Sequence, residues 1–129
     1  QAVDEIKAAI AFHQIEYHVM LGQTPVRSSL AEKSIPLVAY APLAQGRAAT
    51  NETLMTNARK HDATPAQVAL KWLLDQDDVA AIPKASRAES QQANLDALKL
   101  KLDDDDRNAI GALPKTQRFV NPPFAPAWD

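Results

Sequence analysis

Residues 79–89 read VAAIPKASRAE, a short apolar strand that delivers a lysine directly to the start of a helix. Ser86 followed three residues later by Glu89 is typical of a capping box, so we expect the helix to begin there, with its first backbone N–H groups beside Lys84 and Arg87. Such a helix start favours a bound phosphate. The chain has only three glycines and lacks the glycine-rich fingerprints of dinucleotide-binding and P-loop folds, so a nucleotide would have to bind in another way.

The composition narrows the class of protein. The chain has 129 residues, 46% of them hydrophobic and 23% charged, as expected of a single soluble globular domain. A net charge of −2 and a pI near 5.9 predict no general basic surface for nucleic acid or an anionic membrane, so we expect a small-molecule partner. The sequence contains no membrane-spanning run, no signal peptide and no cysteine, and we expect a cytoplasmic protein.

Three strand-length apolar runs alternate with helical patterns. The predicted strands are residues 10–17, 37–40 and 79–82. Three helices are predicted to begin at the caps Thr24, Asn51 and Thr64. A fourth is predicted to run from about Arg87, after the capping box at Ser86, and a last one to follow Asp103. In the helix from about 87 to 98, Ala88, Gln91, Leu95 and Leu98 recur at helical spacing. Residues 3–10 are expected to end an earlier helix, and residues 119–129 to form an irregular tail.

Strands that alternate with helices predict a parallel sheet, because each crossover returns the chain to the same end. Three such units leave both edges of the sheet open. Two completions fit the pattern: a doubly wound sheet, which usually has a glycine-rich first turn, or an eightfold barrel, which needs about 250 residues. The predicted fold class is therefore α/β.

Three segments together resemble the aldo-keto reductase family. They are HQIEYH at 13–18, AYAPLAQG at 39–46, and IPK at 82–84 with Asn94 ten residues beyond the lysine. The ending at 119–129 is similar to that of small prokaryotic members that reduce 2,5-diketo-gluconate and methylglyoxal. The resemblance implies that residues 1–129 are one partial domain, the C-terminal half of a (β/α)8 barrel. Its βα units and last helix would lie in residues 1–118, and a tail that shapes the substrate site in residues 119–129.

The resemblance also implies an NADP(H) site. Gln14 would hydrogen-bond the nicotinamide carboxamide and Tyr40 would stack on the nicotinamide ring, although a core amide and ordinary packing are the alternatives. Lys84 and Arg87 would face the 2′-phosphate. The remaining cofactor residues are the pyrophosphate loop, Ala41, Leu43, Gln45 and Gly46, and the segment around the adenosine, Ala85, Ser86, Ser90 and Asn94. Phe124 and Trp128 would form one wall of the substrate pocket.

The chain departs from the family pattern at several of these positions. Ala41 and Ala85 stand where serines are usual, Ser90 replaces an arginine, and Ala93 replaces an acidic residue. The phosphate contacts are therefore expected to be fewer than is usual. We expect a preference for NADP, with NAD use still open.

Other polar clusters have simpler interpretations. On a strand His13 points away from Glu16 and His18, which leaves too few ligands for a metal on one face, and we predict no metal site. The aspartates at 103–106 are interpreted as a solvated helix start, and His61 as a surface histidine favoured by its neighbour Asp62.

The family's catalytic aspartate, tyrosine, lysine and histidine belong to the first half of the barrel, and no segment here resembles them. We therefore predict that the chain contains no catalytic residue and is not a competent reductase alone. Three hypotheses follow: the cofactor-binding part of a carbonyl reductase that acts on aldehydes, ketones or diketo sugar acids, a non-catalytic nucleotide-binding module, or a half barrel that self-associates. The expected partners are a small carbonyl substrate and either the N-terminal half barrel or a second half barrel.

Overall fold

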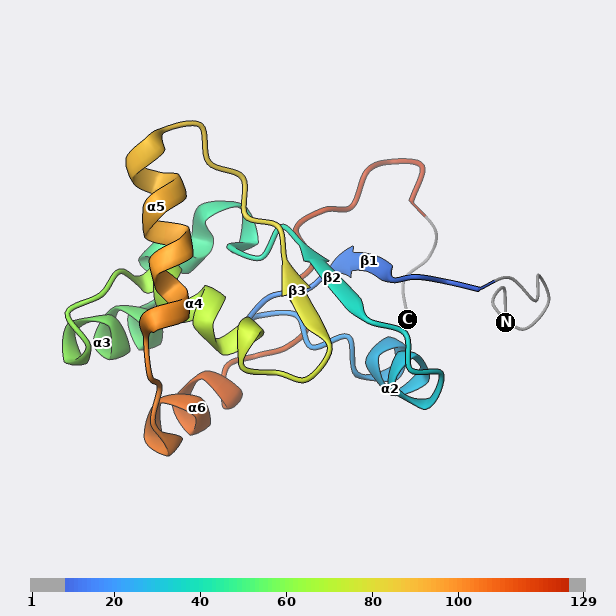
Figure 1. The fold of residues 1–129 in the computed structure, drawn as a ribbon, viewed down its shortest axis with the longest axis horizontal. Coiled ribbons are helices and arrows are strands. Elements are labelled where there is room, and N and C mark those ends of the chain that lie inside the picture. The colour runs from blue at the N-terminus through green and yellow to red at the C-terminus, as the bar shows by residue number, and fades with distance from the viewer. Residues whose placement is uncertain (1–8, 126–129) are drawn as a thin grey trace.

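The computed structural model describes residues 9–125. Three parallel strands, in the order β1-β2-β3, form one sheet, as predicted. Helices α3 to α6 gather on one side of the strands and α2 lies at the opposite end (Figure 1). In chain order the elements are β1 (His13–Glu16), α2 (Thr24–Glu32), β2 (Leu37–Tyr40), a 3-10 segment (Ala44–Thr50), α3 (Glu52–Lys60), α4 (Pro65–Leu74), β3 (Val79–Ala81), α5 (Ala88–Asp96), a 3-10 turn (Ala97–Lys99) and α6 (Asp104–Gly111).

The two faces of the sheet differ. Because side chains alternate along a strand and paired residues share a face, Leu37 and Ala39 point to the opposite side from Val38 and Tyr40. The first side packs on the helices in a core of Tyr17, Leu30, Ile35, Leu37, Ala39 and Leu73. On the second side Gln14 and Ala80 are exposed. One face of the sheet is therefore covered by this chain's helices, and the other is largely bare among the described residues.

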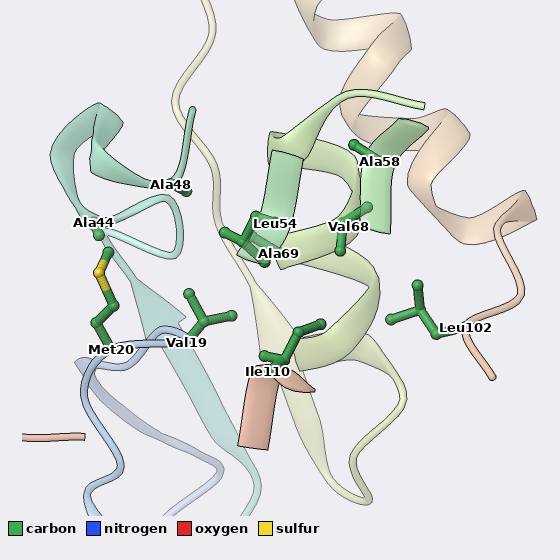
Figure 2. Packing of buried hydrophobic residues seen from close by; sticks show 10 residues of the cluster. All are labelled: Val19, Met20, Ala44, Ala48, Leu54, Ala58, Val68, Ala69, Leu102 and Ile110. Carbon is green, nitrogen blue, oxygen red and sulfur yellow. The ribbon is translucent and has the colours of Figure 1, made fainter. Parts of the chain in front are cut away.

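A second core lies at the carboxyl ends of the strands. It joins the loop after β1, the segment after β2, and helices α3, α4 and α6 (Figure 2). Its ten buried members are Val19, Met20, Ala44, Ala48, Leu54, Ala58, Val68, Ala69, Leu102 and Ile110. This core fixes the loops that follow β1 and β2 in relation to the helices.

Three of the predicted helix starts are confirmed. Asn51 accepts a hydrogen bond from the Leu54 N–H, and Thr64 and Asp103 each form a reciprocal capping box with the third residue of the helix. The prediction for α2 was one residue late. Gln23, in a left-handed conformation, takes the cap position, and Thr24 is the first helical residue.

The capping box predicted at Ser86 is wrong. The backbone stays outside the helix through residue 86, Arg87 takes the cap position, and no side chain caps α5. Counted from Arg87, the third helical position is Ser90, whereas Glu89 falls in the first turn. Gln91 instead donates to the Ala85 carbonyl at 3.1 Å. The one-residue shift removes the geometry that a capping box requires.

Other predicted boundaries need correction too. The first strand covers His13–Glu16 rather than 10–17, and the last ends at Ala81 rather than 82. The helix predicted from 87 to 98 ends at Asp96 and tightens into the 3-10 turn. Leu95 and Leu98 are 62% and 61% exposed, so their helical spacing does not mark a face buried within this chain. Most of the helix tail predicted at 3–10 lies outside the described residues.

The acidic segment at the start of α6 is not simply solvated. Asp106 is buried and accepts from Lys60 at 3.1 Å, and its other oxygen lies 2.6 Å from His61 Nε2. Lys60 also donates to Asp103. His61 is therefore bound to α6 rather than being the surface histidine beside Asp62 that was predicted.

Candidate functional site

Three hollows follow one another along the carboxyl ends of the strands. The β1 hollow, of about 300 Å³, includes Gln14 and Tyr40 in its lining. The loop hollow, of about 400 Å³, is lined by Ala41, Leu43, Gln45, Gly46 and Lys84, among others. The α5 hollow, of about 460 Å³, shares Leu43 and Lys84 with it and adds Ala85, Ser86, Arg87, Ser90 and Asn94. All twelve residues predicted to contact a cofactor thus line this row.

The β1 hollow lies where β1 meets α2. Gln14 and Tyr40 share the bare face of the sheet, because Gln14 pairs with Val38 and Tyr40 lies two residues beyond Val38 on the same strand. Gln23, Pro25 and Val26 of the α2 start and Arg118, the residue before the tail, complete much of its wall. An amide and an aromatic ring there suit a flat polar ring as ligand.

The loop hollow is shaped by an unusual backbone. Ala41, Ala44 and Gln45 have φ angles of 47°, 51° and 52°, and Gly46 has 90°. A positive φ is disfavoured for residues with a Cβ, so this loop stores strain that the core beneath must hold. Ala44 and Ala48 are buried in that core, which explains how the conformation is kept. The turned backbone and small side chains leave room for a ligand close to the main chain.

The α5 hollow carries the cations of the row. Lys84 and Arg87 lie on its wall with the N-terminus of α5 and with Asn94 on the following turn. Gln67 ties α5 to α4, because its side-chain amide donates to the Ala93 carbonyl at 3.0 Å. Two cations beside a helix start suit a phosphate group.

The described structure does not bring together the two residues predicted to form the substrate wall. Phe124 is 89% exposed and Trp128 lies outside the described residues. Arg118, which the sequence did not single out, lines the β1 hollow instead. The residue just before the tail therefore contributes a cation to this region.

A buried polar cluster beside the β1 hollow connects β1 to the tail. Nothing in the sequence predicted this contact. Glu16 is fully buried and accepts from the backbone N–H of Phe119 at 2.8 Å and of Val120 at 3.2 Å. Arg118 Nη1 lies 3.6 Å from Glu16 Oε2. These contacts join β1 to residues more than 100 positions away along the chain, so Glu16 fastens the tail to the end of the strand.

His18 belongs to the same cluster. Its Nδ1 accepts from the Met20 N–H at 3.2 Å, so the proton belongs on Nε2, which faces Glu16 at 3.3 Å. Its ring stacks on Phe119 with the centroids 5.3 Å apart. Burial lowers the pKa of His18 and outweighs the opposing effect of Glu16. His18 and Glu16 are thus structural partners of the tail. Within residues 9–125 no group of three or more His, Cys, Asp or Glu side chains could hold a metal ion.

Comparison with known families identifies the chain. The sequence profile of the aldo/keto reductase family matches residues 1–114. The chain belongs to the aldo/keto reductase family. This membership confirms the resemblance in the sequence, and it decides between the two completions of the sheet, because the family's fold is the barrel.

Two curated relatives of this aldo/keto reductase chain are named as a methylglyoxal reductase and a glyoxal reductase. The chain is 38% identical over 121 residues to methylglyoxal reductase DkgB of Escherichia coli O157:H7, a match that covers 93% of this chain and 45% of that enzyme. It is 37% identical over 114 residues to glyoxal reductase of Bacillus subtilis, covering 88% and 40%. The chain thus spans less than half the length of the curated relatives it matches.

Solved structures also match this chain. A putative 2,5-diketo-D-gluconic acid reductase B superposes with a TM-score of 0.88 at 33% identity over 95% of this chain and 44% of that one. A variant of Gox0644 solved in complex with NADPH gives a TM-score of 0.81 at 32% identity, over 87% and 41%. The three strands and their helices therefore match part of the barrel of solved aldo/keto reductases. No helix in the described part of the chain has the length and apolarity needed to span a membrane.

Proposed function

We propose that this chain is the cofactor-binding part of an NADP(H)-dependent carbonyl reductase. The observation that carries the proposal is the row of three hollows, which brings residues from 14 to 94 together in the order that an extended dinucleotide requires. The relative solved with NADPH supports the choice of cofactor. When bound, NADPH supplies a hydride for a carbonyl carbon.

Each hollow offers the chemistry that one part of the dinucleotide needs. Gln14 and Tyr40 would orient the nicotinamide through an amide hydrogen bond and a ring contact. The turned backbone at 41–46 would lie against the pyrophosphate, and Lys84 and Arg87 would neutralise the 2′-phosphate. Asn94 would hydrogen-bond the adenine. The amides, the aromatic ring and the cations of the row thus suit both the nicotinamide end and the adenosine end of the cofactor.

The proposed substrates are small aldehydes, ketones and diketo sugar acids, as the names of the relatives suggest. Tyr40 is the phenol in the described row of hollows, and the proposal uses its ring as a stacking surface rather than its hydroxyl as a proton donor for the carbonyl oxygen. We propose that the other half of a barrel supplies that donor, and that this partner covers the bare face of the sheet, where Ile82 is 49% exposed. A second copy of this chain is the alternative partner, and sedimentation of the chain alone would detect it.

Cofactor binding can be measured directly. NADPH fluorescence titrated with the chain should saturate, and NADPH should bind about tenfold or more tightly than NADH because two cations face the extra phosphate. The double change Lys84→Ala with Arg87→Ala should remove most of that preference and leave NADH binding nearly as before. Arg59→Ala, an exposed arginine on α3, is the matched control and should change neither titration.

The same experiment can defeat the proposal. No saturable signal with either nucleotide would exclude a cofactor role for this chain. Equal NADPH affinity in the double variant and the unmodified chain would show that the 2′-phosphate does not bind at Lys84 and Arg87. Addition of methylglyoxal should cause no NADPH oxidation by the chain alone.

A further inference from the structure

The α5 hollow is bounded by two separate pieces of the chain. Lys84, Arg87 and Asn94 belong to one continuous segment, the loop after β3 together with α5. Thr64 and Ala66, at the start of α4, line the same hollow. A ligand in the hollow therefore meets both helices, and the distance between them sets how much room it has.

The two walls differ in how they are fixed. Close behind its start, helix α4 buries four residues, Val68, Ala69, Leu70 and Leu73. Helix α5 buries none, and the first buried residue after it is Ala97, in the 3-10 turn. The part of α5 that carries the cations is therefore not positioned by side chains buried in a core, and its place depends on polar contacts.

Gln67 joins the two walls. Its side-chain Nε2 donates to the Ala93 carbonyl of α5 at 3.0 Å. Its Oε1 accepts from the Thr64 N–H at 2.9 Å and from the Thr64 hydroxyl at 3.1 Å, as part of the capping box of α4. Because only the oxygen of an amide can accept from a backbone N–H, the capping box turns the NH2 group toward α5. Both ends of one amide are thus used, one on each helix.

The wall that carries the cations has a contact of its own. Gln91 of α5 donates to the Ala85 carbonyl at 3.1 Å, so the loop after β3 stays with α5. Gln67 does not line the hollow, and the carbonyl that it binds lies next to Asn94, the residue proposed to hydrogen-bond the adenine. Loss of the Gln67 contact would therefore move α5 and its loop together, away from their place beside α4.

We propose that Gln67 sets the width of the α5 hollow and thereby positions the adenine of the bound nucleotide. This inference rests on the proposed cofactor role, which it deepens at that hollow. Gln67 is a positioning residue that acts through Ala93 and Asn94 and touches no nucleotide. Because NADPH and NADH carry the same adenine, the Gln67 contact contributes equally to the binding of both, whereas Lys84 and Arg87 favour the extra phosphate.

The test measures both nucleotides on the full chain. Gln67→Met keeps the length of the side chain but removes the donor, and it should weaken NADPH and NADH each about fivefold, the effect of one lost hydrogen bond. The ratio of the two affinities should stay within about twofold of its value in the unmodified chain. The double change Lys84→Ala with Arg87→Ala should change this ratio instead. Unchanged affinities in Gln67→Met, or a loss confined to NADPH, would overturn the inference.

A second variant separates the contact with α5 from the cap of α4. Gln67→Glu keeps an oxygen for the Thr64 N–H, but it places a carboxylate oxygen against the Ala93 carbonyl. Amide hydrogen exchange of α5 should become about fivefold faster, while that of α4 stays unchanged. Adenosine, which has no phosphate for the new charge to repel, should bind this variant about fivefold more weakly in a titration followed by NMR of the backbone amides. If either measurement matched the unmodified chain, the inference would be wrong.

Two controls match these variants. Gln92→Met makes the same substitution on α5, where the Gln92 side chain donates to Asp96 of its own helix at 3.1 Å, and it should change neither nucleotide affinity. Asn51→Ala removes the cap of α3 and should also change neither, because it destabilises a helix that does not line the hollow. A loss of affinity in Asn51→Ala equal to that in Gln67→Met would assign the effect to a general loss of stability, and would defeat the inference.

Failure of the inference and failure of the proposed function are distinguishable. Saturable NADPH binding with the same affinity in the unmodified chain and in Gln67→Met would defeat only the inference. Absence of saturable binding of either nucleotide by the unmodified chain would defeat the cofactor role, and the positioning role of Gln67 with it.

Discussion

The two outer strands of the sheet end in different surroundings. At the end of β1, four consecutive residues, Glu16 to Val19, are fully buried, and the tail returns from the far end of the sequence to cover them. At the end of β3 the strand has no buried residue, and α5 behind it has none either. This chain packs the β1 end with its own tail, whereas the β3 end has no such cover among the described residues.

The helices behind the sheet repeat this contrast. Thr64 with Gln67 and Ser86 with Glu89 have the same kind of capping sequence, yet only the first forms a capping box. Helix α4 buries Val68, Ala69, Leu70 and Leu73, which hold its start in one position. Helix α5 lacks such contacts, so its start could shift by one residue. Burial, more than the local motif, decides whether the cap forms.

The largest expected effect comes from the anchored end. Glu16→Ala would leave His18 and two tail N–H groups without their acceptor, and it should lower the free energy of unfolding by about 3 kcal/mol. Urea unfolding followed by circular dichroism measures this change. Glu32→Ala, at an exposed glutamate at the end of α2, is the matched control and should stay within about 0.5 kcal/mol of the unmodified chain. Similar losses of unfolding free energy in both variants would mean that the contact between Glu16 and the tail stabilises the fold no more than an exposed glutamate does.

The same contact shows where prediction from the sequence stops. The caps at Asn51, Thr64 and Asp103 could be predicted because each depends on residues three positions apart. The residues that the family resemblance predicts to contact a cofactor line one row of hollows, and this agrees with the rule that parallel strands end at one edge of a sheet. The pairing of Glu16 with Phe119 could not be predicted, since it joins residues more than 100 positions apart through backbone N–H groups that any residue but proline provides.

A smaller effect should separate the two helix starts. Thr64→Ala should lower the free energy of unfolding by about 1 kcal/mol because it removes a working cap. Ser86→Ala should have almost no effect on unfolding, because Ser86 lies outside the helix and caps nothing. Thermal or urea unfolding of the two variants side by side gives the difference. A comparable loss for Ser86→Ala would restore the capping box that the sequence predicted.

A still smaller change should follow from pH at the anchored end. Burial lowers the pKa of His18, so the native state keeps it neutral below pH values at which the unfolded chain, with an ordinary pKa near 6.5, takes up a proton. Stability should therefore fall between pH 7.5 and pH 6, by less than the Thr64→Ala change. His18→Gln should lose this slope, and His13→Gln, at an exposed histidine, should retain it. A slope that persists in His18→Gln would assign it to another group.

The smallest effect is expected at the uncovered end. Leu95→Ala and Leu98→Ala should leave the free energy of unfolding within about 0.5 kcal/mol, because both side chains are more than 60% exposed. Leu54→Ala, the same change inside the second core, should cost about 3 kcal/mol. If Leu95→Ala or Leu98→Ala proved as costly as Leu54→Ala, the outer face of α5 or of the 3-10 turn after it would have to be packed in solution. A loss that grew with protein concentration would then assign that packing to a second copy, because only an association depends on concentration.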